Sequence, residues 1–274
     1  MRFSKENAVS IVHVVFYTPA LVTSILLCLR LTWHPFGGWF FLFLFSLIRI
    51  AGAIVDLAQI AGPSSKSLHT AAVTLGFVGI SSLLLATLGL IIRIRRIITE
   101  NHPTSIKPLY LGVIWYCNIA AFVLYLRGGI FSGEKMDKTG SILTQVGVGI
   151  SSGVFVFMFI IACVLLRHRS HADIKEQTLH AAVLASMPFL LVRLLYAALV
   201  AFYKRKGFNV DDGNAISVIF MSVMPEIIVV FIYTVVGFRL PRLPMESNHK
   251  RKHRECQIWQ RWTSRSISNK KQVS

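Results

Sequence analysis

Long apolar blocks alternate with short polar connectors along most of the chain. A helix needs about 20 mostly apolar residues to cross roughly 30 Å of hydrocarbon, and seven of the blocks reach that length. The connectors contain the Gly, Pro, Asn and Asp residues that commonly end helices. The pattern therefore predicts an all-α, polytopic membrane protein with seven transmembrane helices, over residues 9–29, 39–61, 69–92, 109–127, 144–166, 179–203 and 215–238.

The composition agrees with a membrane protein and separates a basic C-terminal segment from the apolar part of the chain. Hydrophobic residues make up 54% of the chain and charged residues only 15%, whereas a soluble domain carries about 25% charged residues. No connector is long enough to hold a further domain, so residues 1–240 are predicted to form one seven-helix transmembrane domain. Residues 241–274 are basic, and we expect a disordered tail that enforces the topology or contacts anionic lipid headgroups.

The formal net charge of +17 follows a membrane pattern rather than that of a nucleic-acid-binding protein. If the N-terminus lies outside, the inner connectors and the tail hold twice as many Lys and Arg residues as the N-terminal segment and the outer connectors together. Basic residues accumulate on the cytoplasmic side, so this bias predicts an outside or lumenal N-terminus and a cytoplasmic tail. Lys270 and Lys271 resemble a dilysine retrieval signal displaced by one place, which favours the endoplasmic reticulum.

Four ionisable residues fall well inside the predicted spans: Arg49, Asp56, Arg193 and Glu226. Each costs about 2.5–3.5 kcal/mol at the centre of a membrane, so such residues usually face the bundle interior and carry function. At 1.5 Å of rise per residue, Arg49, Arg193 and Glu226 lie roughly 18, 15 and 16 Å from the outer ends of their spans. Asp56 lies roughly 8 Å from the outer end, two turns from Arg49 on nearly the same helix face.

Two interpretations of these charges stay open. The buried groups either form an ion-pair cluster that locks three helices together, or they form the polar floor of an apolar cavity. Pro188 and Pro225, in the middle of their spans, favour a cavity because proline kinks a helix and frees a carbonyl. Aromatic residues at expected inward positions would line it: Trp115, Tyr116, Tyr125, Tyr196, Phe231 and Tyr233.

Gly149 and Gly153 form a Gly-x-x-x-Gly motif inside the fifth span. A nucleotide-binding loop would require a strand before it, and none is predicted. We therefore expect these glycines to allow close packing of helices.

Three segments resemble a family of fungal seven-pass membrane proteins. They are Ser-Leu-Ile-Arg-Ile-Ala-Gly at 46–52, Met-Pro-Phe-Leu-Leu-Val-Arg-Leu-Leu-Tyr at 187–196, and Met-Ser-Val-Met-Pro-Glu at 221–226, followed by Tyr233. The resemblance extends over about residues 9–240. The family includes membrane-bound terpene cyclases of meroterpenoid biosynthesis, of the kind that act in the ascochlorin, ascofuranone and macrophorin pathways.

The resemblance implies an isomerase of secondary metabolite biosynthesis that protonates an epoxide or alkene of a farnesylated aromatic or quinone-like compound. Such chemistry needs a neutral carboxylic acid, which burial favours and adjacent arginines disfavour. Asp56 is then the expected proton donor, and Glu226, beside Arg49 and Arg193, the ionised counter-charge or final base; a pair that shares one proton is the alternative. The implied reaction needs no metal or other cofactor, and the lipophilic prenylated substrate would enter from the membrane lipids.

A non-enzymatic function remains as the alternative. Kinked helices, basic inner connectors and an outside N-terminus are also typical of seven-helix receptors and of lipid-handling transporters. The chain shows no cysteine pair that would join outer connectors, and no internal repeat of the kind that many transporters carry.

Overall fold

A computed structural model describes residues 5–31, 38–61, 66–101, 108–133, 137–166, 174–202 and 219–240. All of these residues belong to one of the two units into which the chain divides, Met1–Pro241. The predicted basic tail, residues 241–274, lies outside the described residues.

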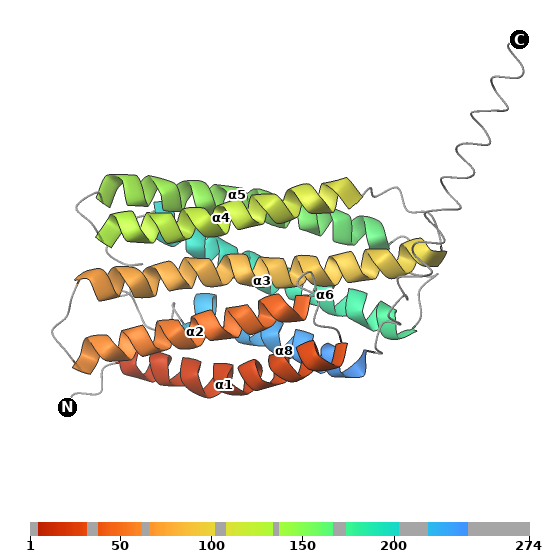
Figure 1. Ribbon diagram of the computed structural model, residues 1–274, viewed down its shortest axis with the longest axis horizontal. Helices are drawn as coiled ribbons and strands as arrows, with labels where there is room; N and C mark the ends of the chain where they lie inside the picture. The colour runs from red at the N-terminus through yellow and green to blue at the C-terminus, as the bar shows by residue number, and fades with distance from the viewer. Residues whose placement is uncertain are drawn as a thin grey trace, which may run out of the picture. The chain divides into compact units, whose positions relative to one another are not determined.

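The prediction of an all-α fold is confirmed for the described residues, which are helical except for a bend at Leu240. Seven helices are long and apolar enough to cross a membrane (Figure 1). A short π-helical turn, η2 (Ile219–Val223), runs directly into the last of them. The helices are α1 (Lys5–Leu31), α2 (Gly38–Ala61), α3 (Lys66–Asn101), α4 (Pro108–Gly133), α5 (Asp137–Leu166), α6 (Ile174–Phe202) and α8 (Met224–Arg239).

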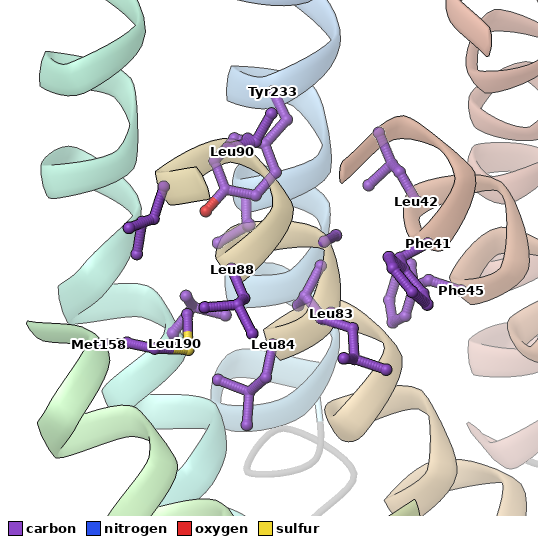
Figure 2. Packing of buried hydrophobic residues seen from close by; sticks show 14 of the residues in the cluster. Phe41, Leu42, Phe45, Leu83, Leu84, Leu88, Leu90, Met158, Leu190 and Tyr233 are labelled. Atoms are coloured by element: carbon purple, nitrogen blue, oxygen red, sulfur yellow. The ribbon is translucent and has the colours of Figure 1, made fainter. Parts of the chain in front are cut away.

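Successive helices run in opposite directions, so α1, α3, α5 and α8 all begin at one end of the bundle, which we call the N-terminal end. Helix α3 lies at the centre, in contact with α2, α4, α5 and α6. Its apolar window is 78% buried, against 22% for α1. Leucines of α3 pack among apolar side chains of the neighbouring helices (Figure 2). The labelled residues include Leu83, Leu84, Leu88, Phe45, Met158 and Leu190.

Hydrogen bonds also join helices across the bundle. The Tyr233 hydroxyl of α8 lies 2.9 Å from Thr87 Oγ1 of α3 and 2.6 Å from Ser186 Oγ of α6. Gln145 of α5 donates from Nε2 to the Ala201 carbonyl of α6 at 3.0 Å. Lipid tails are as apolar as leucine, so the hydrophobic effect contributes little to helix association and such polar contacts matter more than in a soluble bundle.

The expectation of close packing at Gly149 and Gly153 is wrong within this chain. Both glycines are exposed on the outer face of α5, and a Cβ atom at either would meet nothing within 4 Å. Close packing occurs instead at Gly147, where a Cβ would lie 2.8 Å from the Tyr125 ring, and at Gly128, where it would lie 2.6 Å from Thr144 Oγ1. Two residues turn a helix by about 200°, so Gly147 and Gly149 face opposite sides.

Proline 225 does not kink a continuous helix as expected. It lies in the first turn of α8, directly after the π-helical η2. In the first turn of a helix the missing N–H of proline has no carbonyl partner to lose, so proline is tolerated there. Pro188, in contrast, lies inside α6 as the sequence predicts, with its side chain exposed. Short π-helical turns are frequent at functional sites, and this one ends three residues before Glu226.

Candidate functional site

Glu226 is fully buried, with 0% of its surface exposed, and its carboxylate accepts hydrogen bonds from side chains of three other helices. Its Oε1 atom accepts hydrogen bonds from Arg49 Nη2 of α2 and from Arg193 Nε of α6, and both pairs are salt bridges. Its Oε2 atom accepts a hydrogen bond from the Tyr17 hydroxyl of α1 at 3.1 Å. We call Tyr17, Arg49, Arg193 and Glu226 the charge cluster.

The two arginines are nearly as buried as the glutamate, at 8% and 5% exposed. The contact between them and Glu226 agrees with the depth count, which placed all three at one level. Arg193 also donates from Nη2 to the Gly76 carbonyl of α3 at 3.2 Å, and its guanidinium lies over the Tyr196 ring at 5.7 Å. These contacts compensate part of the cost of removing two guanidiniums from water.

Helix α3 accommodates the charge cluster through a glycine. A Cβ atom at Gly79 would lie 3.4 Å from Arg49 Nε, in van der Waals contact, so there is little room for further atoms. The Arg49 guanidinium also lies over the Phe45 ring, 5.7 Å from its centroid. A larger residue at position 79 would therefore push Arg49 away from Glu226.

Three of the four helices that supply the cluster carry a proline close to the residue they supply. Pro19 follows Tyr17 by two residues in α1, and Glu226 directly follows Pro225. Pro188 precedes Arg193 by five residues in α6. Inside α1 and α6, proline removes one backbone hydrogen bond and distorts the adjacent turn, and Pro225 follows the π-helical turn η2, so all three helices are locally irregular near the level of the charges.

Sequence reasoning missed the contribution of α1. Tyr17 is 1% exposed, and its ring packs edge-on against Phe45 at 5.5 Å between centroids. His13, one turn earlier on the same face, packs its ring against Tyr17 at 5.6 Å. The available signal was two polar aromatic residues four apart in an otherwise apolar span. Neither residue carries a permanent charge, so the charge pattern of the sequence does not reveal them.

Asp56 lies two turns beyond Arg49 on α2, toward the N-terminal end of the bundle. Its side chain is half-buried. At 1.5 Å per residue, the seven intervening steps separate it from Arg49 by roughly 10 Å along the helix. Asp56 therefore lies on the same face as the charge cluster, but nearer to the end of the bundle.

The predicted aromatic residues divide into inward and outward sets. Tyr125, Tyr196 and Tyr233 are buried and Trp115 is half-buried, but Tyr116 is 69% and Phe231 68% exposed. The inward positions expected for Tyr116 and Phe231 are therefore wrong. Adjacent residues on a helix point about 100° apart and residues two apart about 200°, so Tyr116 cannot share a face with Trp115, nor Phe231 with Tyr233.

A cleft of about 200 Å³ opens between α3, α4 and α5. Phe77 stacks on Tyr125 at one side of it, 5.5 Å between centroids, and the Tyr125 hydroxyl lies 3.0 Å from Ser151 Oγ. The remaining lining residues are Thr70, Val73, Thr74, Gly128, Gly129, Ser132 and Thr144. Tyr125 is the one predicted site residue that lines the cleft, so this cleft is not the cavity expected above the charges.

Residues 3–243 match a family model described as a domain of unknown function, DUF7702. The match covers most of the chain, including every described helix. The chain belongs to the DUF7702 family. No curated protein and no solved structure matches it.

The DUF7702 domain thus places two guanidiniums, one carboxylate and one phenol at a common point within the membrane, with a second carboxyl group two turns away. Removing one partner of a buried ion pair costs about 3–5 kcal/mol, because the other charge is left buried and unpaired. Among the described residues of this DUF7702 domain, no three His, Cys, Asp or Glu side chains gather as a metal site requires. The groups assembled here are suited to holding charge and transferring protons.

Proposed function

We propose that this protein is a membrane-bound terpene cyclase of fungal meroterpenoid biosynthesis. Its substrate would be a farnesylated aromatic or quinone-like compound, with or without an epoxide on the prenyl chain. The observation that carries the proposal is the pair of carboxyl groups in different surroundings. Glu226 is held by two guanidiniums and a phenol, whereas Asp56 lies two turns from the nearer guanidinium and is half-buried.

The different surroundings assign different roles to the two carboxyl groups. Three donors stabilise the ionised form of Glu226, which suits a counter-charge for a carbocation or the base that removes the final proton. Asp56 lies two turns from Arg49 along α2, outside the contact that holds Glu226 between two guanidiniums, so its neutral form is less disfavoured and it is the better proton donor. Separate environments that push two carboxyl groups toward opposite protonation states are the usual basis for dividing acid and base roles.

In the proposed reaction, Asp56 transfers its proton to the epoxide oxygen or to the terminal alkene carbon. The carbon that becomes electron-deficient is attacked by the π electrons of the next double bond, so that a ring closes and the positive charge moves along the chain. The Glu226 carboxylate then takes a proton from a carbon next to the last cationic centre. The product has the mass of the substrate, so the reaction is an isomerisation.

Aromatic rings would stabilise the cationic intermediates through the negative faces of their π systems. The ring of Tyr17, within the charge cluster, is suited to this role. Phe45 and Tyr196 already lie under the Arg49 and Arg193 guanidiniums, and the Tyr233 hydroxyl bonds to Thr87 and Ser186, so these three rings serve mainly to hold the cluster and the helices in place.

The substrate must reach the cluster through a space other than the cleft beside Tyr125. That cleft is smaller than the roughly 300–1,000 Å³ of a typical ligand pocket. We propose that a prenylated substrate enters from the bilayer between the helices that surround the cluster. The N-terminal end of the bundle would face the outside or the lumen of the endoplasmic reticulum, and the basic tail the cytoplasm.

The complete burial and pairing of Glu226 favour a second function. Its side chain is 0% exposed, and both of its carboxylate oxygens accept hydrogen bonds from protein donors. A buried, fully paired ion cluster can serve as a lock between helices. The protein would then be a non-enzymatic seven-helix protein, either receptor-like or lipid-handling, whose cluster fixes one arrangement of α1, α2, α6 and α8.

Expression in a host without meroterpenoid pathways separates the two functions. Membranes that contain the protein are supplied with a farnesylated epoxide, and the products are separated by chromatography and mass spectrometry. The cyclase predicts a new product with the same mass as the substrate. It also predicts that Asp56→Asn abolishes this product, because the amide cannot donate the proton.

Ser46→Ala serves as the matched control on the same helix, since the Ser46 hydroxyl bonds to the Leu42 carbonyl of its own helix. The control should leave the product unchanged. Product yield is normalised to the amount of folded protein in each membrane. Full activity of Asp56→Asn would show that this residue is not the donor, and absence of any isomer with the unaltered protein would favour the non-enzymatic function.

A further inference from the structure

Gly76 of α3 borders open space on a helix face that is otherwise buried. A Cβ atom at Gly76 would meet nothing within 4 Å among the residues that the structure describes, and the residue is half-buried. The residues that follow on the same face, Ile80, Leu83 and Thr87, are 4%, 1% and 0% exposed. Protein interiors are close-packed, with few voids larger than a water molecule. The close packing of this face therefore ends at Gly76.

The open space faces the interior of the bundle. On this face of α3, the Thr87 hydroxyl lies 2.9 Å from the Tyr233 hydroxyl of α8. The Gly76 carbonyl itself accepts a hydrogen bond from Arg193 Nη2 of α6 at 3.2 Å. Phe77, which lines the cleft between α3, α4 and α5, points about 100° away from Gly76. The open space is therefore separate from that cleft and adjoins the charge cluster.

The packing of α2 on α3 gives the level of this space within the bundle. A Cβ atom at Gly52 of α2 would lie 3.7 Å from Leu75 Cβ of α3, so Gly76 lies at about the level of Gly52. Gly52 lies three residues, roughly 5 Å, beyond Arg49 toward the N-terminal end of the bundle. Asp56 lies four residues, roughly 6 Å, beyond Gly52 in the same direction. The open space thus lies between the level of the charge cluster and the level of Asp56.

Buried side chains at this level are apolar on three neighbouring helical segments. They lie about one turn from the charge cluster toward the N-terminal end, and they are 1–2% exposed. The three are Ala53 of α2, Ala197 of α6 and Val223, the last residue of η2. An apolar group therefore fits this level better than a charged one, which would lose its hydration without gaining a partner here.

We propose that the open space beside Gly76 holds the prenyl chain of the substrate. This inference rests on the proposed function, in which Asp56 gives a proton to the chain and Glu226 removes one. A chain at the level of Gly76 lies between the two carboxyl groups, with the donor toward one end of the bundle and the base toward the other. Gly76 is then a specificity-determining residue, because any side chain at this position would occupy the space that the chain needs.

Photolabelling tests the position of the chain without requiring turnover. The full-length protein in lipid nanodiscs is illuminated with a farnesylated phenol that carries a diazirine on its prenyl chain, then digested and analysed by mass spectrometry. We expect label in the α3 peptide that contains Gly76, and we expect an excess of unlabelled farnesylated phenol to prevent it. Gly76→Leu should reduce the preventable labelling by at least roughly tenfold, the lower end of the effect of a single methylene in an apolar site.

Gly149→Leu is the matched control. A Cβ atom at Gly149 also meets nothing within 4 Å, but this residue lies on the exposed face of α5. It should keep the labelling of the unaltered protein. Gly76→Leu should unfold at no lower temperature than the unaltered protein, because a side chain placed in open space displaces nothing and leucine favours a helix more than glycine does.

Three results would overturn the inference. Equal labelling of Gly76→Leu and Gly149→Leu would show that the chain does not lie beside Gly76. Label that the unlabelled compound does not prevent would show that no site holds the chain. Loss of folded Gly76→Leu protein would show that the space beside Gly76 is filled.

This result and the test of cyclization can be told apart. Labelling that is lost in Gly76→Leu, together with no isomer from the fed epoxide, would retain the site and reject the cyclase. An isomer formed equally by Gly76→Leu and the unaltered protein would retain the cyclase and reject the site.

Discussion

At the scale of single residues, the site depends on one carboxylate that carries three hydrogen bonds. Glu226 neutralises one of two buried guanidiniums and compensates part of the charge of the other. Loss of its charge would leave both arginines in a low-dielectric interior without their closest counter-charge. The hydroxyl of Tyr17 cannot replace it, because it too is a donor in this arrangement.

We therefore expect Glu226→Gln to lower the free energy of unfolding in detergent micelles by about 3–5 kcal/mol. Arg239→Gln, at an exposed position in the last turn of α8, should change it by less than about 0.5 kcal/mol. Thermal unfolding followed by circular dichroism measures both.

A triple variant sharpens this test. Replacing a whole buried ion pair by apolar residues is often neutral or stabilising. Arg49→Met with Arg193→Met and Glu226→Leu should therefore be more stable than Glu226→Gln alone. If the triple variant is the less stable of the two, unpaired charge does not explain the loss.

At the scale of helices, the direction of each face decides which contacts form. Helix α5 places Gly147 against the Tyr125 ring and Gly149 on its outer surface. A side chain at Gly147 must displace an aromatic ring, whereas a side chain at Gly149 meets open space within the chain. Two glycines only two residues apart thus have opposite structural importance.

Gly147→Val should destabilise the bundle and Gly149→Val should not. Overpacking a well-packed site typically costs about 1–3 kcal/mol, so we expect a clear fall in the unfolding temperature for the first variant and little change for the second. Unfolding in the same detergent measures the difference. Equal effects of the two substitutions would show that α5 is rotated relative to the arrangement described above.

Helix faces also mark how far the sequence could predict the site. Hydropathy alone identified the spans, because the length of an apolar block is a property of the chain. The depth of Arg49, Arg193 and Glu226 could be counted for the same reason. The inward face could not be predicted, since helices surrounded by lipid are apolar all round and give little contrast between their faces. Tyr116 and Phe231 were misplaced on this account, and His13 and Tyr17 carry no charge to reveal them.

At the scale of the whole molecule, Asp56, His13 and the cleft beside Tyr125 all lie nearer to the N-terminal end of the bundle than the charge cluster does. The distribution of Lys and Arg predicts that this end faces the outside or the lumen.

A glycosylation tag fused before Met1 should therefore be modified in the endoplasmic reticulum, and the same tag fused after Ser274 should not. The shift in mass on a gel, removed by a glycosidase, reports modification. The opposite pattern would show that the N-terminal end of the bundle faces the cytoplasm.

The central claim is that a carboxylic acid within this bundle starts a cyclization by giving up a proton. Incubation of the purified protein in nanodiscs with a farnesylated substrate that retains its terminal alkene, in D₂O, tests it most directly. The account predicts a cyclic product that carries one non-exchangeable deuterium at the protonated carbon, formed by the unaltered protein and by Ser46→Ala but not by Asp56→Asn. A product without deuterium, or none with the unaltered protein, would contradict it.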